Sequence, residues 1–193
     1  MRFASVIRFA SRLVNGVRLL GRRRHKRNVA TSRQVLQLLS SFGHEGAVIN
    51  YLRKVDPYVV EEVVLSLFEA RGFFVLRNVS YSGDGGLDGR FWWPGVGWHA
   101  IQCKRYASAI NPAHARAFQF MVQLDYRGGV FVHTGRTGDQ SQEALAPAGL
   151  YLLSGSTLTR CIKGECPLTL MANRKHARDT SPRVAQTRIA VHQ

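Results

Sequence analysis

Apolar and polar residues follow two regular patterns in the middle of the chain. Apolar residues spaced three and four apart predict a helix that begins at Asp56-Pro57 and ends at Gly72, and another that runs from Asn111-Pro112 to about Leu124. Short apolar runs predict strands, and a short helix is expected over 139–147. The predicted strands are 73–76, 87–92, 98–104, 128–134 and 150–153. Strands interleaved with helices in this order predict an α/β fold with a mixed β-sheet flanked by helices.

The first twenty residues show a different pattern, in which apolar side chains recur every three or four positions with arginines between them. This spacing predicts a basic amphipathic helix. It could lie on a membrane surface, contact nucleic acid, pack on the domain or act as an organelle-targeting segment. The basic run from Arg22 to Arg27 breaks the pattern and predicts a linker or a tether that contacts phosphates. Two short packing helices are expected next, one after Thr31 and one over 47–52.

Composition narrows the class of protein. The chain has 193 residues, of which 45% are apolar, enough for one domain and a small appendage. No apolar run is long enough to span a bilayer. Three cysteines do not suit a disulfide framework, so we expect a reducing compartment, the cytoplasm.

The formal charge of +15 is concentrated at the two ends. Residues 1–34 contain ten Arg or Lys and no acidic residue, and residues 160–193 contain seven Arg or Lys and two acids, whereas the segment between them is balanced. Such ends favour a polyanionic partner, with DNA as the main candidate. We expect a basic amphipathic extension and linker over 1–34, a short helical packing segment over 35–55, a catalytic domain over 56–160 and a basic, disordered tail over 161–193.

Candidate chemistry lies on the two strands of a predicted hairpin. The segment Ser82–Gly89 places Asp84 and Asp88 around a glycine-rich turn, and Gln102 and Lys104 share one side of the following strand. Asp88 and the Gln102 amide oxygen are hard ligands that suit Mg²⁺, for which Mn²⁺ can substitute. Lys104 could orient the attacking water or stabilise negative charge during phosphodiester hydrolysis. On these residues alone, an ordinary polar strand edge is an equal alternative.

The helix before the hairpin carries two adjacent acids with different expected surroundings. Its apolar stripe contains Val60, Val64 and Phe68, among others. At about 100° per residue, Glu62 falls opposite this stripe, whereas Glu61 lies on its flank. We therefore expect Glu61 to face the site, where it could hold a metal-bound water or a second ion.

The order of these motifs resembles the catalytic domain of the Mrr family of restriction endonucleases, within the PD-(D/E)xK nuclease superfamily. The resemblance covers 56–158 and rests on the Glu61 helix, the segments SGDGGLDG, IQCKRY and GVFVHTG, and the turn LLSG. It implies a restriction-endonuclease-like fold and a Mg²⁺-dependent deoxyribonuclease that hydrolyses phosphodiester bonds. By this resemblance, Asp88 is the metal-binding aspartate, Gln102 stands at a position that is Gln in Mrr-type members, Lys104 is the catalytic lysine, and Glu61 is the helix glutamate.

Three further residues are candidate substrate contacts: Asp84, Arg105 and Arg136. Cleavage of both strands at one place normally needs two sites, so a homodimer is expected. Two other classes stay open. The chain could be a catalytically inactive DNA-binding module with the same fold, or it could associate with a membrane surface through its N-terminal basic helix.

Overall fold

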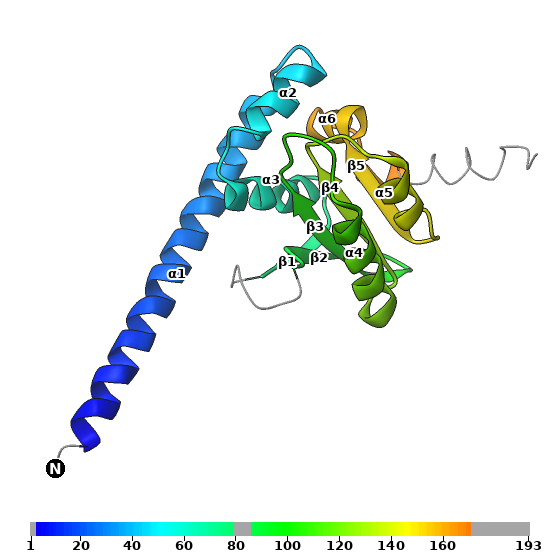
Figure 1. The fold of residues 1–193 in the computed structure, drawn as a ribbon. Coiled ribbons are helices and arrows are strands. Elements are labelled where there is room, and N and C mark those ends of the chain that lie inside the picture. Colours follow the sequence, from blue (N-terminus) through cyan, green and yellow to red (C-terminus); the bar gives the residue numbers. More distant parts are fainter. Residues whose placement is uncertain (1–2, 79–85, 171–193) are drawn as a thin grey trace, which may run out of the picture.

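A five-stranded sheet forms the centre of the protein in a computed structural model that describes residues 3–78 and 86–170 (Figure 1). Its spatial order follows the chain, β1-β2-β3-β4-β5. The first three strands pair antiparallel, and β3, β4 and β5 pair parallel. The strands are β1 (Phe74–Arg77), β2 (Gly89–Trp93), β3 (Gly97–Lys104), β4 (Gly128–His133) and β5 (Leu150–Ser154). The predicted mixed sheet is confirmed, with the β2–β3 hairpin at its antiparallel side.

Helices cover both faces of the sheet. On one face, α1 (Phe3–Ser40), α2 (Glu45–Leu52), α3 (Pro57–Ala70) and α6 (Gly155–Ile162) form a core with the strands, which contribute Phe91, Ile101 and Val130. On the other face, α4 (Pro112–Asp125) and α5 (Asp139–Ala144) pack against Ala100 and Phe131. The result is a three-layer α/β/α arrangement, in which α3 lies directly against the sheet.

The predicted ends of α3 are confirmed by its local contacts. Asp56 caps the helix, because its Oδ1 accepts a hydrogen bond of 2.9 Å from the backbone N–H of Tyr58. Pro57 occupies the first turn, where its missing N–H costs nothing. Gly72 has φ +84°, a left-handed conformation that suits glycine and directs the chain into β1.

The predicted linker at residues 22–27 is wrong, because α1 continues through it from Phe3 to Ser40. Residues 23, 24, 26 and 27 are exposed side chains of this helix, whereas His25 turns inward to Glu62, with 3.1 Å between His25 Nδ1 and Glu62 Oε1. The short helix expected after Thr31 is therefore the last part of α1, where Val35 and Leu39 enter the core. Packing on α3 holds the polar stretch in a helix that its own pattern does not predict.

The burial of Glu62 also differs from what the sequence predicts. Although it lies opposite the apolar stripe of α3, it is only 1% exposed, because α1 covers that side of the helix. Glu62 Oε2 accepts a hydrogen bond of 2.8 Å from Arg77 Nε, and Arg77 also binds Ser66 and Glu69. Ser66 in turn hydrogen-bonds Ser32 of α1 at 2.9 Å. A buried polar network thus joins α1, α3 and β1.

The C-terminal boundary is later than the sequence predicts. A disordered tail was expected from residue 161, whereas helix α6 continues to Ile162 and residues 167–170 form a further helical turn. Cys161, Ile162 and Leu170 belong to the core. The rest of the expected tail, residues 171–193, lies outside the described residues.

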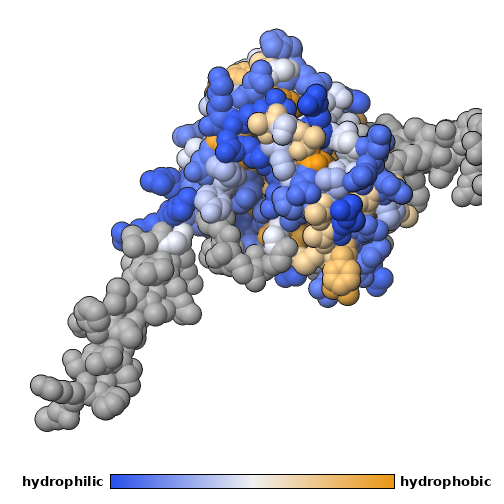
Figure 2. Space-filling model, in the orientation of Figure 1, coloured by the Kyte–Doolittle hydropathy of each residue, from blue (hydrophilic) through white to orange (hydrophobic). Residues whose placement is uncertain are grey.

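The surface of the body is mostly hydrophilic on the face seen in Figure 2, with an apolar patch over one end of α4. Phe120 and Leu124 of α4 are exposed there, at 62% and 63%. Within the part of the chain that the structure describes, no helix is long and apolar enough to cross a membrane.

Removal of the buried carboxylate of Glu62 is predicted to destabilise the protein strongly. Glu62→Ala removes one of the two carboxylates that bind the Arg77 guanidinium, whose side chain is 11% exposed, so we expect a loss of about 3 kcal/mol in the free energy of unfolding. Urea denaturation of the variant and of wild type measures this difference in the free energy of unfolding. Glu165→Ala is the matched control, because it removes an exposed ion pair with Arg160 and should change stability little. Equal losses in the two variants would contradict the buried network.

Candidate active site

The hairpin fixes Asp88 against the end of β3. Asp88 directly precedes β2, and its N–H donates a 3.0 Å hydrogen bond to the carbonyl of Ile101. Its Oδ2 accepts a hydrogen bond of 2.5 Å from the backbone N–H of Cys103. The carboxylate is therefore held between the positions of Gln102 and Lys104, as the hairpin predicts.

Gln102 offers an oxygen atom that the protein does not use. The residue is 6% exposed, and its Nε2 donates a hydrogen bond to the carbonyl of Gly86. Its Oε1 is buried and has no hydrogen-bond partner among the described residues. Gly86 has φ +87°, and a Cβ atom there would lie 2.9 Å from Gln102 Nε2, so only glycine allows this close contact. A buried carbonyl oxygen without a partner is costly unless a ligand completes it.

Glu61 reaches the same end of the sheet from the first turns of α3. Burial, together with the negative charge of Asp88, raises the pKa of Glu61 to about 8, although the charge of Lys104 acts in the opposite direction. At neutral pH, Glu61 therefore holds a proton while Asp88 is close by. Burial beside a second carboxylate therefore favours the protonated form of Glu61.

This donor set fits a divalent cation such as Mg²⁺, which prefers oxygen ligands and tolerates a small number of protein groups. In residues 3–78 and 86–170, no three His, Cys, Asp or Glu side chains lie together as a metal site. The fit therefore depends on the amide oxygen of Gln102 beside the carboxylates of Asp88 and Glu61. Lys104, half-buried at the end of β3, supplies the cationic side chain of the cluster.

The three candidate substrate contacts are placed differently. Asp84 lies outside the described residues. Arg105 is exposed, and its Nη1 donates to the carbonyl of Arg53 at the end of α2. Arg136 is exposed too, and its backbone is fixed by hydrogen bonds to Ser108 and Ile110. Neither arginine side chain is joined to the Asp88 cluster by a described contact.

Two residues at this rim were not predicted from sequence as structural parts of the site. His133 pairs with Lys104 in the β3–β4 register, is fully buried, and accepts a 3.1 Å hydrogen bond at Nδ1 from Gly135 N–H. Burial lowers the pKa of His133 to about 4, so it stays neutral and holds the loop after β4. Arg53 donates through Nε to the carbonyl of Thr134 at 2.9 Å. In the sequence, the position of Arg53 shortly before the Asp56 cap is the only feature that points to this role.

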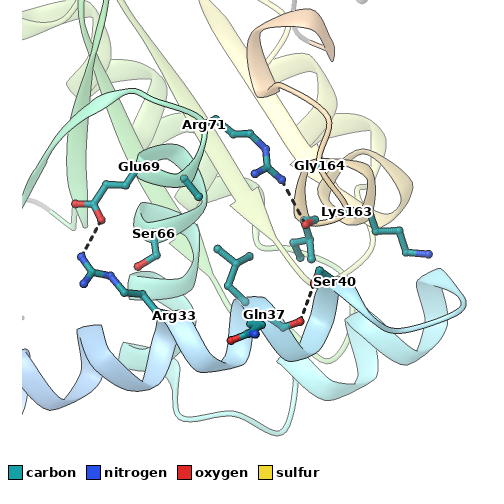
Figure 3. Close-up of a pocket in the computed structure, with 11 residues that line it drawn as sticks. Arg33, Gln37, Ser40, Ser66, Glu69, Arg71, Lys163 and Gly164 are labelled. Atoms are coloured by element: carbon teal, nitrogen blue, oxygen red, sulfur yellow. Dashed lines mark hydrogen bonds and ion pairs between the residues drawn. The ribbon is translucent and has the colours of Figure 1, made fainter.

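A separate hollow of about 620 Å³ lies between α1, α3 and the end of α6 (Figure 3). Arg33 binds Glu69 at one side of it, and Arg71 donates through Nη2 to the carbonyl of Cys161 at 2.7 Å on the other. None of the candidate catalytic residues lines this hollow. The hollow therefore lies where α1 packs on the body, away from the candidate site at the hairpin.

A mixed sheet between two helical layers, with a carboxylate, an amide and a lysine at the hairpin rim, is a restriction-endonuclease-like α/β domain. The match to a family model agrees with this class: residues 52–162 match the Mrr_cat restriction endonuclease model. The match covers more than half of the chain, and the protein belongs to this family. The resemblance inferred from the sequence motifs is thereby confirmed, and a nuclease function is supported.

The other comparisons add little beyond the family. No curated protein matches the chain. Among solved structures, the MspJI restriction endonuclease in complex with a 27-mer oligonucleotide is similar, with 18% identity and a TM-score of 0.37. The similarity covers 76% of this chain and 35% of that one, so this protein spans about a third of the length of MspJI.

The raised pKa of Glu61 predicts a pH-dependent stability. Between its ordinary value of 4.5 and about 8, the folded protein binds more protons at this group than the unfolded chain, so stability falls as the pH rises through that range. Glu61→Gln removes this loss. In EDTA we expect the variant to match wild type near pH 4.5 and to exceed it by about 1–2 kcal/mol at pH 8.5, a value reduced because the group is partly open to solvent.

Urea denaturation at the two pH values measures this difference. Glu143→Gln, at an exposed position on α5, is the control and should follow wild type at both. A variant that is less stable than wild type at pH 8.5 would show that Glu61 ionises readily and that the cluster is not short of positive charge.

Proposed function

We propose that this protein is a Mg²⁺-dependent DNA endonuclease that hydrolyses phosphodiester bonds at the rim formed by Asp88, Gln102, Lys104 and Glu61. The observation that carries the proposal is the buried Oε1 of Gln102, which has no described hydrogen-bond partner. The next residue along β3, Cys103, binds the Asp88 carboxylate through its N–H. Asp88 and Gln102 would hold the ion, which would supply charge neutralisation for the substrate phosphate. Two copies acting together would cut both strands of a duplex.

The protein side chains divide the remaining tasks. The Asp88 carboxylate is fixed by Cys103 N–H, so it does not need to reorganise when substrate arrives. Lys104, at the end of β3, positions the attacking water or stabilises the negative charge that builds up on the phosphate. Glu61, which burial keeps protonated at neutral pH, would release its proton to solvent beside a bound cation and would then accept a hydrogen bond from a water at the site.

Helix α1 provides a basic surface close to these residues. Arg23, Arg24, Lys26 and Arg27 are exposed, and the guanidinium of Arg24 lies 4.7 Å from the centre of the Tyr58 ring, one turn before Glu61 on α3. Positively charged side chains beside the first turn of α3 suit contacts with the DNA backbone, which do not depend on sequence. We propose that this row of α1 holds the duplex near the rim.

Plasmid nicking at low salt tests the proposed activity directly. Asp88→Asn keeps the size of the side chain but removes its charge, and Lys104→Ala removes the cation, so each is expected to lower the cleavage rate at least about 100-fold in Mg²⁺ or Mn²⁺. Wild type should be inactive in EDTA. Asp125→Asn, the same change at an exposed position on α4, is the control and should cleave as wild type does.

Two results would overturn the assignment in different ways. If Asp88→Asn and Lys104→Ala cut as fast as wild type, the activity does not reside at this rim. If wild type and both variants shift DNA in a gel but cut nothing in either metal, the fold is used for binding alone.

A further inference from the structure

The N-terminal half of α1 stands apart from the rest of the protein. Figure 1 shows the first turns of the helix, in dark blue, leading away from the body, while the later part crosses α3 and packs against it. The described contacts of α1 with the body begin at Arg24 and His25, which reach Tyr58 and Glu62, and continue through Ser32 and Val35. The described contacts therefore join the body to the part of α1 from Arg24 onward.

The sequence of this segment divides into two sides when it is placed on a helix. At 100° per residue, nine apolar residues fall within one arc of about 160°. They are Phe3, Val6, Ile7, Phe9, Ala10, Leu13, Val14, Val17 and Leu20. The opposite arc holds Arg8, Arg12, Arg18, Arg22 and Arg23, with Leu19 and small or polar residues between them and no acidic residue. Because the structure has a continuous helix from Phe3, this division applies to the folded chain.

The width of the apolar arc and the sign of the charge identify the partner. A coiled coil with a second copy uses a narrow seam and needs mixed charges beside it, whereas this helix would bring arginines against arginines. DNA would satisfy the arginines but leave the nine residues of the apolar arc in water. An anionic lipid surface satisfies both sides, because the apolar arc enters the acyl boundary and the arginines bind the headgroups.

We propose that residues 3–23 of α1 form a membrane-surface anchor, which binds in the plane of an anionic bilayer and holds the catalytic domain next to it. The helix does not span the bilayer, since its charged side must stay with the headgroups. The domain follows without a flexible joint, because α1 continues into the part that is bound to α3 through His25 and Glu62. This inference does not depend on nuclease activity.

Vesicle flotation with the full-length protein tests the anchor. Wild type is expected to float with vesicles of phosphatidylcholine and phosphatidylglycerol and to stay behind with phosphatidylcholine alone. Val14→Gln/Val17→Gln keeps the charge but places polar groups in the apolar arc, and it should weaken vesicle binding at least about thirtyfold. Ser5→Gln/Ser11→Gln, the matched change on the opposite side, should bind as wild type does.

Binding of a short DNA duplex and gel filtration are measured on the same proteins, with circular dichroism to confirm equal helix content. We expect the Val14/Val17 variant to bind DNA and to elute as wild type does. If it floats as wild type does, the apolar side does not enter lipid and the proposal fails. If it loses DNA affinity or dissociates from a dimer instead of losing vesicle binding, the helix serves DNA or a second copy, and the proposal is equally overturned.

Discussion

The buried ion pair between Glu62 and Arg77 holds the parts of this protein in their relative positions. It joins α3 to β1, and Glu62 also reaches His25, so that α1 is fixed to the same point. Charges this deeply buried are tolerated only when further polar groups complete them, as Ser66 and Glu69 do for Arg77. The next residue along α3, Glu61, is thereby directed to the other side of the helix and toward the sheet rim.

Two adjacent glutamates therefore have opposite surroundings on one helix. Glu62 is compensated by a guanidinium and an imidazole, whereas burial and the nearby carboxylate of Asp88 raise the pKa of Glu61. Gln102, whose Oε1 has no described hydrogen-bond partner, lies on β3, and Lys104 is the last residue of that strand. We propose that this uneven distribution of charge serves a cation bound at the rim.

Local signals predicted much of this architecture, because caps, turns and strand alternation act over a few residues. The Asp56 cap, the β2–β3 hairpin and the shared side of Gln102 and Lys104 all follow from such signals. The continuous α1 and the burial of Glu62 do not, because each depends on a helix far away in sequence covering a polar stretch. α6 was missed for a related reason: its eight residues are held by core contacts of Cys161 and Ile162, and no long periodic pattern marks them.

We propose that Asp88 and Gln102 hold a divalent cation at the end of β3. A crystal structure of the protein with Mn²⁺, with data collected at the manganese absorption edge, tests this proposal. We expect one anomalous peak between the Asp88 carboxylate and Gln102 Oε1, at about 2.2 Å from each oxygen, and no peak there in Asp88→Asn. A peak elsewhere in the protein, or an unchanged peak in the variant, would contradict it.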